Sequence, residues 1–251
     1  MRIIICGCGG KMGKTVINTT KNYSDCEIVA GIDKQHQDNF EFPVFSNPSE
    51  ITADADVIID FSHPSMLSNL LDYSIKTHTP AVICTTGLSE SQLEEIKEVS
   101  KTVPIFYSRN MSLGVNLLAE LSRKAAEFLK SDFDVEIIEK HHNQKIDAPS
   151  GTALMLAEEI SNAANEKPVY VFDRTQTRKS RSKDEIGIHC VRGGNICGDH
   201  EVIFAGNNEI ITLSHHAGSR EIFANGAIKA AFFLQHQKPG LYEMKDIIEN
   251  I

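Results

Sequence analysis

Residues able to transfer protons gather between positions 139 and 153 of this 251-residue chain. The segment Glu139–Ala153 places two imidazoles and a lysine just ahead of a run of small residues. Reduction of a polarised C=C or C=N bond by hydride leaves charge that needs a proton donor at the same moment. Lys145 is a point cation suited to this task, and His141 can donate or relay a proton near neutral pH. We therefore take His141 and Lys145 as candidate catalytic residues of a reductase.

The same segment ends in a pattern suited to binding a carboxylate. Ser150, Gly151 and Thr152 at a helix N-terminus offer N–H groups and a hydroxyl to an anion. With His142 and Lys145 added, the segment fits a small, strongly anionic substrate. Two adjacent histidines do not readily face one metal ion, so no metal site is expected. A purely structural polar loop is the other interpretation.

A glycine-rich turn near the N-terminus follows an apolar strand and opens a helix. Small residues there let the backbone approach a pyrophosphate, which the helix N-terminus stabilises through its N–H groups and its dipole. This position between strand and helix favours a nucleotide site over a plain turn. The candidate cofactor residues of the turn are Gly7, Cys8, Gly9, Gly10, Lys11, Met12 and Gly13.

An acidic residue, Asp33, ends the second expected strand about 20 residues after the last glycine of the turn. At this spacing a carboxylate accepts hydrogen bonds from the adenosine ribose of a dinucleotide. Lys34 follows at once and can meet a 2′-phosphate. The pair favours NADH and leaves NADPH open, while the alternative for Asp33 is a simple turn residue at a strand end.

Two further loops lie where expected strands end, which is where doubly wound sheets bind their ligands. Threonine hydroxyls, the backbone of Gly87 and the amide of Asn110 can contact ribose and nicotinamide. Taken singly, each loop is also compatible with a plain turn. These loops add the candidate cofactor residues Cys84, Thr85, Thr86, Ser108, Arg109, Asn110 and Met111.

The elements that must position these residues change in kind along the chain. Up to about residue 111, short apolar runs alternate with helix-period segments, which predicts an α/β, Rossmann-like, doubly wound parallel sheet. Strands are expected at 2–7, 27–32, 57–61, 81–84 and 104–107. Helices are expected from the glycine turn to about 22, around 66–75, and over 89–101.

Beyond residue 111 the pattern predicts a central α+β domain with a mixed or antiparallel sheet, because strands no longer alternate with helices. We expect a helix through 117–129, a strand at 135–139, a polar loop at 140–149 and a helix over 153–160. Strands follow at 186–191, 201–204 and 209–214, and a final helix over 219–235 is expected to pack on the first domain. The basic stretch 174–183 is either a solvated loop or a segment near an anionic cofactor or a subunit interface.

Composition and charge exclude several classes of protein. The net charge of -9 disfavours a general binder of nucleic acid or of anionic membranes. No apolar run approaches the ~18 residues of a membrane span, and the N-terminus lacks the shape of a signal peptide. The six cysteines form no C-x-x-C pair, and four of them lie in or beside apolar segments of the N-terminal half, which suits reduced, buried thiols: Cys6, Cys8, Cys26 and Cys84. We therefore expect a soluble, cytoplasmic protein.

Over essentially its whole length the chain resembles the 4-hydroxy-tetrahydrodipicolinate (dihydrodipicolinate) reductases of the diaminopimelate and lysine pathway. The most specific shared run is H-H-x-x-K-x-D-A-P-S-G-T-A at 141–153. The other shared motifs are G-x-G-G-x-M-G from Gly7, D-F-S-H-P from Asp60, T-T-G from Thr85, N-M-S-L-G-V from Asn110, R-G-G from Arg192, G-D-H from Gly198, H-A-G-S-R from His216 and F-A-N-G-A from Phe223.

The resemblance implies a dinucleotide domain over 1–111, completed by 221–251, and a substrate-binding and tetramerisation domain over 112–220. It implies a homotetramer, NADH and/or NADPH as cofactor, and a small dicarboxylate substrate that receives hydride at ring C4 and loses its 4-hydroxyl as water. His141 matches the proton donor/acceptor of the family and Lys145 its proton donor. His142, Gly151 and Thr152 match its substrate-binding positions.

Two positions depart from the family pattern. Cys84 stands where the family has glycine in G-T-T-G, and it brings a side chain to a place where backbone approaches the cofactor. Arg109 stands where a small residue is common before the asparagine, and it either adds a phosphate contact or points to solvent. Neither position belongs to the proton-transfer residues.

Two other functions stay open at this stage. One is a different reductase or amino-acid dehydrogenase on the same scaffold, against which the H-H-x-x-K spacing and the S-G-T helix start argue. The other is an NAD(H)-sensing protein without turnover, which the presence of His141, Lys145 and Thr152 disfavours. The fold alone does not separate these functions.

Overall fold

The computed structural model describes residues 1–34, 39–163, 167–175 and 178–249. The chain divides into two compact units. The first unit comprises Met1–Leu113 and Arg220–Ile251, and the second comprises Gly114–Ser219. Each unit is built around its own sheet and its own apolar core.

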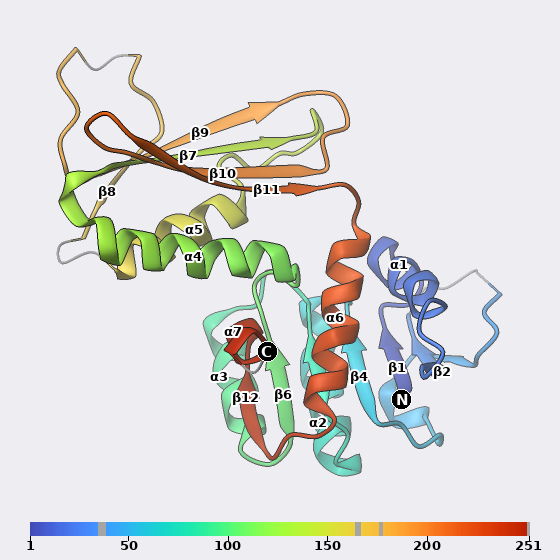
Figure 1. Cartoon of the computed structure of the whole chain (residues 1–251). Coiled ribbons are helices and arrows are strands. Elements are labelled where there is room, and N and C mark those ends of the chain that lie inside the picture. The colour runs from blue at the N-terminus through green and yellow to red at the C-terminus, as the bar shows by residue number, and fades with distance from the viewer. Residues whose placement is uncertain (35–38, 164–166, 176–177, 250–251) are drawn as a thin grey trace. The chain divides into compact units, whose positions relative to one another are not determined.

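The first unit is a parallel sheet with the strand order β12-β6-β5-β4-β1-β2-β3 (Figure 1). Its strands are β1 (Arg2–Cys6), β2 (Glu27–Ile32), β3 (Val44–Phe45), β4 (Val57–Asp60), β5 (Ala81–Ile83), β6 (Pro104–Tyr107) and β12 (Gly240–Tyr242). Its helices are α1 (Lys11–Thr20), α2 (Leu67–Thr77), α3 (Glu90–Ser100), α6 (Glu221–Leu234) and α7 (Met244–Glu249), with 3-10 turns η1 (Pro48–Glu50) and η2 (Pro64–Met66). The strand order reverses at β1, so the carboxyl ends of β1 and β4 mark the point where such sheets bind ligands.

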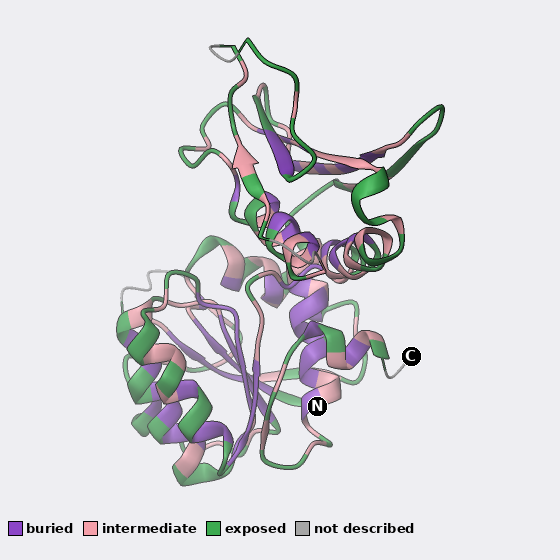
Figure 2. Ribbon diagram, turned by 90° about the vertical axis from the view of Figure 1, so that its left-hand side faces the viewer, coloured by how far each residue is buried: buried purple, intermediate pink, exposed green. Residues whose placement is uncertain are grey.

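Side chains that alternate along the strands build a core on each face of this sheet. Ile3 and Ile5 of β1 point to the face covered by α6, whereas Ile4 points to the face covered by α2 and α3. Because helices cover both faces, the strands are continuous apolar runs rather than alternating ones. Figure 2 shows the central strands of this sheet mostly buried, while the outer sides of the helices are exposed.

The expectation that the last helix returns to the first domain is confirmed by α6. Ala227 and Ile228 of α6 are fully buried in one core with Ile5 of β1. A Cβ at Gly226 would lie 1.7 Å from the carbonyl oxygen of Met111, so the close approach of this helix to the backbone needs a glycine.

The second unit has a mixed sheet with the strand order β11-β10-β7-β9-β8. Strand β10 pairs antiparallel with β7 and β11, whereas β9 pairs parallel with β7 and β8. Its elements are α4 (Leu113–Leu129), η3 (Lys130–Asp132), β7 (Asp134–His141), α5 (Gly151–Asn162), β8 (Val169–Val171), β9 (Glu185–Arg192), β10 (Gly198–Ala205) and β11 (Ile210–Ala217). Leu118 of α4 and Leu156 of α5 pack against Ile137 and Val202 on one face of the sheet.

The predicted fold class is confirmed, but several boundaries differ. The strand expected at 135–139 continues to His141 because Lys140 pairs with Asp199 and His141 with Arg192. His141 therefore stands at the end of a strand and not in the polar loop expected at 140–149. Pairing with β10 likewise extends the strand expected at 209–214 to Ala217.

The described part of the chain contains no helix that is both long and apolar enough to cross a membrane.

Candidate functional site

The glycine turn of the first unit follows β1 and leads into α1 at the carboxyl edge of the sheet. Gly7 has a φ of +78°, and a Cβ there would lie 2.5 Å from the carbonyl oxygen of Phe61. A Cβ at Gly13 would lie 2.1 Å from the carbonyl oxygen of Gly7. Both positions therefore require glycine for the turn to close onto β4 and α1.

The start of α1 offers its backbone N–H groups outward. Gly10 caps the helix without a side-chain hydrogen bond, and no acidic residue lies in its first turn. A helix N-terminus of this kind attracts an anion through its N–H groups and its dipole. The turn therefore fits a pyrophosphate.

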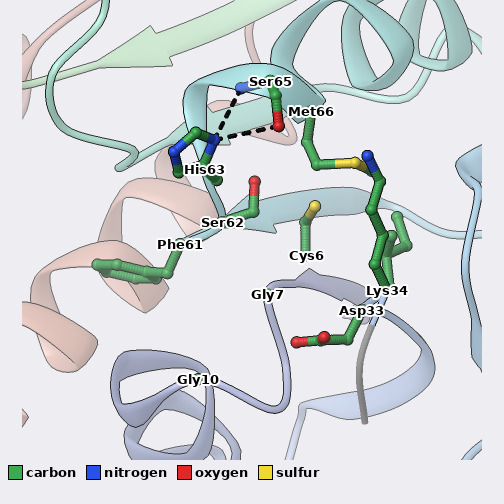
Figure 3. A pocket seen from close by; sticks show the side chains of 11 residues that line it. Cys6, Gly7, Gly10, Asp33, Lys34, Phe61, Ser62, His63, Ser65 and Met66 are labelled. Atoms are coloured by element: carbon green, nitrogen blue, oxygen red, sulfur yellow. Dashed lines mark hydrogen bonds between the residues drawn. The ribbon is translucent and has the colours of Figure 1, made fainter.

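A cavity of about 510 Å³ lies beside this turn. It is lined by Asp33 and Lys34, the two residues expected to select the cofactor. Asp33 and Lys34 lie along one side of it, and Phe61 and His63 lie along the other (Figure 3). Asp33 accepts a hydrogen bond of 3.0 Å from the backbone N–H of Gly9, so its carboxylate is held at the edge of the glycine turn.

A second cavity of about 420 Å³ brings together most of the other expected cofactor residues. The loop after β5 and the loop after β6 line it, together with Met12 of α1 and with Arg220 and Phe223. The expected residues that line this cavity are Met12, Cys84, Thr85, Thr86, Ser108, Arg109, Asn110 and Met111. Arg109 thus shares a cavity with the residues around it in the sequence.

Some residues of the glycine turn take no part in lining these cavities. The side chain of Cys8 is fully buried in the core of the first unit, and Lys11 is exposed. Gly9 and Gly13 contribute backbone geometry, through the bond to Asp33 and through the contact with Gly7.

A buried carboxylate ties the loops of this edge together. Asp60, at the end of β4, is 1% exposed and accepts hydrogen bonds from the Ser62 N–H at 3.0 Å and from the Thr85 hydroxyl at 2.7 Å. Burial raises the pKa of Asp60, and the hydrogen bonds from Ser62 and Thr85 oppose that rise. Asp60 therefore positions two residues that line the second cavity.

Several residues that line the two cavities were not predicted from the sequence. Phe61, Ser62 and His63 belong to the D-F-S-H-P motif, Met66 follows two residues after its proline, and Arg220 precedes α6. For Phe61, Ser62, His63 and Met66 the available signal was their position after β4, the strand beside β1 at the switch point. The residues present, a glycine turn, an uncapped helix start and an acidic residue after β2, fit a bound dinucleotide.

The second unit brings the expected catalytic and substrate residues to one end of its sheet. His141 ends β7, and Ser150 caps α5 by accepting a hydrogen bond of 3.1 Å from the Ala153 N–H. Gly151 and Thr152 are the first two helical residues, and their N–H groups precede the intrahelical hydrogen bonds. The capped start of α5 therefore fits a carboxylate ligand.

Glu139 lies behind His141 and connects it to the start of α5. Its carboxylate contacts Nδ1 of His141 at 2.6 Å and accepts a hydrogen bond of 3.0 Å from the Ser150 N–H. Burial would raise the pKa of Glu139, but hydrogen bonds from Arg192, His141, Cys190 and Ser150 outweigh burial and lower that pKa to about 2. The carboxylate is thus ionised.

Lys145 lies on the turn that leaves β7. Its Nζ is 2.9 Å from a carboxylate oxygen of Asp147, and its side chain is 22% exposed. The hydrogen bond from Lys145 lowers the pKa of Asp147, so the pair is ionic. His142 accepts the Lys145 N–H at its carbonyl oxygen, and this turn keeps the two residues close.

His200 lies beneath this group and was not assigned from the sequence. Its Nε2 is 3.0 Å from the Ser150 hydroxyl, and its ring contacts that of His141 edge to face with centroids 5.2 Å apart. Burial, reinforced by the neighbouring His141, lowers the pKa of His200 from 6.5 to about 4. His200 is therefore neutral near pH 7.

We expect His200→Gln to flatten the acid dependence of stability. The folded chain binds fewer protons at this site than the unfolded chain between pH 6.5 and about 4, so stability falls as the pH falls through this window. The loss is about 3 kcal/mol in the free energy of unfolding. Urea unfolding of wild type and variant across this window measures it.

The exposed His236 supplies the control, since His236→Gln should leave the acid dependence of the wild type unchanged. Equal slopes for wild type and His200→Gln would contradict the assignment of a neutral, buried His200.

The basic stretch at 174–183 includes residues 176–177, which lie outside the described residues. Among the others, Arg174 pairs with Glu185, and Arg181 pairs with Asp134 at 2.9 Å and with Glu136 at 3.1 Å. These two arginines therefore bind carboxylates of the second unit itself. Across the described residues, no group of three or more histidines, cysteines or acidic residues is arranged to hold a metal ion.

Comparison with known proteins gives the same family over nearly the whole chain. The family models for the N-terminus and the C-terminus of dihydrodipicolinate reductase match residues 1–111 and 114–248. The 4-hydroxy-tetrahydrodipicolinate reductase of Caldanaerobacter subterraneus is 53% identical over 249 residues, which is 99% of this chain and 98% of the relative. The reductase of the same name from Clostridium tetani is 49% identical, over 97% of this chain and 95% of the relative.

A solved structure agrees with these relatives. The dipicolinate-bound dihydrodipicolinate reductase from Paenisporosarcina sp. TG-14 superposes with a TM-score of 0.83 at 27% identity, covering 98% of this chain and 99% of that one. The predicted resemblance is thereby confirmed. The chain belongs to the dihydrodipicolinate reductase family.

Proposed function

We propose that the chain reduces (2S,4S)-4-hydroxy-2,3,4,5-tetrahydrodipicolinate to tetrahydrodipicolinate with loss of water, using NAD(P)H, in diaminopimelate and lysine biosynthesis. The observation that carries this proposal is the grouping of His141, Lys145 and the Ser150-capped start of α5 at one end of the second sheet. The relatives named 4-hydroxy-tetrahydrodipicolinate reductase support the same substrate.

The residues of the second unit bind the substrate and move protons. A carboxylate of the substrate accepts hydrogen bonds from the Gly151 and Thr152 N–H groups, with His142 as a further polar contact. Reduced nicotinamide supplies the hydride for ring C4. Lys145, whose Nζ lies 2.9 Å from a carboxylate oxygen of Asp147, donates a proton to the charge that hydride addition leaves, and His141 donates or accepts the accompanying proton.

The residues of the first unit hold the cofactor. The glycine turn and the start of α1 bind the pyrophosphate, while the second cavity takes the nicotinamide and its ribose. Asp33 accepts hydrogen bonds from the hydroxyls of the adenosine ribose, which favours NADH. Lys34 lines the first cavity beside Asp33 and lets the enzyme also accept the 2′-phosphate of NADPH.

A coupled assay tests this function. A synthase generates the unstable substrate from pyruvate and aspartate semialdehyde, and oxidation of NADH and then of NADPH is followed by absorbance. Substrate-dependent oxidation with a higher kcat/KM for NADH supports the proposal. Quenching of NADH fluorescence without any turnover would instead favour the sensing protein, and turnover only with another imine or enoate would favour a different reductase.

We further propose that the second unit assembles the chain into a homotetramer in the cytoplasm. Large apolar side chains are exposed on this unit, among them Phe128 at 86% and Ile210 at 68%. Exposed apolar side chains that form a contiguous patch are typical of a surface that another chain covers. The six cysteines are free thiols, as expected in a reducing compartment.

Light scattering during gel filtration tests the assembly. We expect a particle with four times the chain mass of 27.8 kDa, and Ile210→Asp should reduce that mass because it places a charge in an apolar contact. Glu249→Gln, far from the second unit in sequence, is the control. A monomeric wild type would contradict the tetramer.

A further inference from the structure

A fully buried carboxylate stands behind the histidine to which we assign proton transfer. Register aligns Cys190, Glu139, His200 and His215 in one row across β9, β7, β10 and β11. His141 is two residues further along β7, so it shares the face of Glu139. Glu139 itself is 0% exposed.

Arg192 neutralises this carboxylate with two parallel hydrogen bonds. Its Nη1 donates to Oε2 at 2.8 Å, and its Nη2 donates to Oε1 at 2.7 Å. The same Nη2 donates to the carbonyl oxygen of Asp147 at 2.6 Å. A bidentate pair of this kind is the geometry that best compensates a buried carboxylate.

The hydrogen bonds to the Glu139 carboxylate occupy both of its oxygens, so neither oxygen carries a proton. Oε1 accepts from Arg192 and from the Ser150 N–H, and Oε2 accepts from Arg192 and contacts His141 Nδ1. An ionised carboxylate only accepts hydrogen bonds, so Nδ1 of His141 must be the donor of the 2.6 Å bond. Nε2 is then the ring nitrogen that gains and loses the proton.

The surroundings of Nε2 agree with this assignment. A Cβ at Gly198 would lie 3.0 Å from Nε2 and 3.4 Å from Cδ2 of the His141 ring. The absence of a side chain at Gly198 therefore leaves the ring room in this orientation.

We propose that Glu139, paired with Arg192, is a positioning residue that fixes His141 with Nδ1 protonated and Nε2 presented for proton exchange, and that joins it to the start of α5. This inference rests on the proposed function, because it assigns the proton exchange to that reaction. Glu139 stays ionised throughout: the proton that His141 exchanges with the substrate moves only through Nε2. The Glu139 carboxylate also accepts the hydrogen bond of the Ser150 N–H. It therefore positions both the proton donor/acceptor His141 and the helix start that binds the substrate.

The tautomer of His141 tests the inference in the wild type without any turnover. Long-range ¹H–¹⁵N spectra of the labelled protein, taken where the imidazole is neutral and assigned with His141→Gln, identify the protonated ring nitrogen. We expect Nδ1 to carry the proton. A neutral His141 protonated at Nε2 would overturn the inference.

Variants connect the tautomer to catalysis. Glu139→Gln should lower kcat about 10²–10³-fold and change the tautomer, because a wrongly protonated imidazole cannot exchange the proton at Nε2. NADH binding should stay unchanged, and Glu139→Asp should restore the tautomer and part of kcat. Glu139→Gln with the wild-type tautomer and with kcat within about threefold of wild type would overturn the inference.

Glu136→Gln is the matched control. Glu136 lies on the same strand and also pairs with a histidine and an arginine, His189 at 2.8 Å and Arg181 at 3.1 Å, but on the opposite face of the sheet. It should leave both the tautomer of His141 and kcat unchanged. If Glu139→Gln does not fold, the wild-type tautomer and Glu139→Asp decide. Absence of wild-type turnover with Nδ1 protonated would refute the proposed reaction but not the positioning of His141, so the two failures are distinct.

Discussion

Lys145→Ala is expected to lower kcat about 10²–10⁴-fold while the Kd for NADH stays within about twofold of wild type. Lys145 is a cation held 2.9 Å from the Asp147 carboxylate, on the turn between His141 and the start of α5. Its removal deletes the proton donor at the moment when hydride addition leaves charge on the substrate. The coupled assay measures kcat, and NADH fluorescence measures the Kd.

The control for this variant is the same lysine-to-alanine substitution at a site away from the proposed catalytic residues. Lys183 is also a lysine of the second unit paired with an aspartate, Asp134 at 3.5 Å, but it is exposed. Lys183→Ala should therefore leave kcat unchanged. A raised KM for the substrate with an intact kcat would mean that Lys145 only binds the substrate, and a weaker affinity for NADH alone would contradict its role altogether.

The edge of the first unit to which we assign the cofactor was predictable because its determinants are local. A buried strand, a glycine turn and a helix follow one another within the first 20 residues, and both Gly7 and Gly13 are required by contacts inside that unit. The short elements β3, β12 and α7 were not predicted. Their length gives no periodicity, and β12 exists through its pairing with β6, more than a hundred residues away in the sequence.

The second unit was less predictable, because the pairing register of its strands, and not the local sequence pattern, brings its site residues together. The residue types of His141 and Lys145 were sufficient to single them out, yet His141 was expected in a loop. Its place at the end of β7 comes from pairing with Arg192 of β9. Arg192 and His200 belong to motifs that carry the family resemblance, but neither motif indicates that these side chains meet Glu139 and Ser150.

Gly13→Ala is expected to weaken NADH binding about 10²-fold, because the new methyl group meets backbone that cannot move aside. A Cβ at Gly13 would lie 2.1 Å from the Gly7 carbonyl oxygen and 2.7 Å from the Cα of Cys8. Relief of this overlap requires the glycine turn and α1 to separate, and overpacking of this kind costs about 1–3 kcal/mol or more. The turn then no longer presents the helix start to the pyrophosphate.

Displacement of the glycine turn by Gly13→Ala should weaken NADH binding more than it slows catalysis by the enzyme with NADH bound. The expected result is therefore a raised Kd for NADH in fluorescence titrations, with kcat at saturating NADH much less changed than by Lys145→Ala. Gly218→Ala is the matched control, since a Cβ at Gly218 meets nothing within 4 Å and its affinity for NADH should equal that of wild type. A Gly13→Ala variant that is folded and binds NADH as tightly as wild type would show that the cofactor does not depend on this turn.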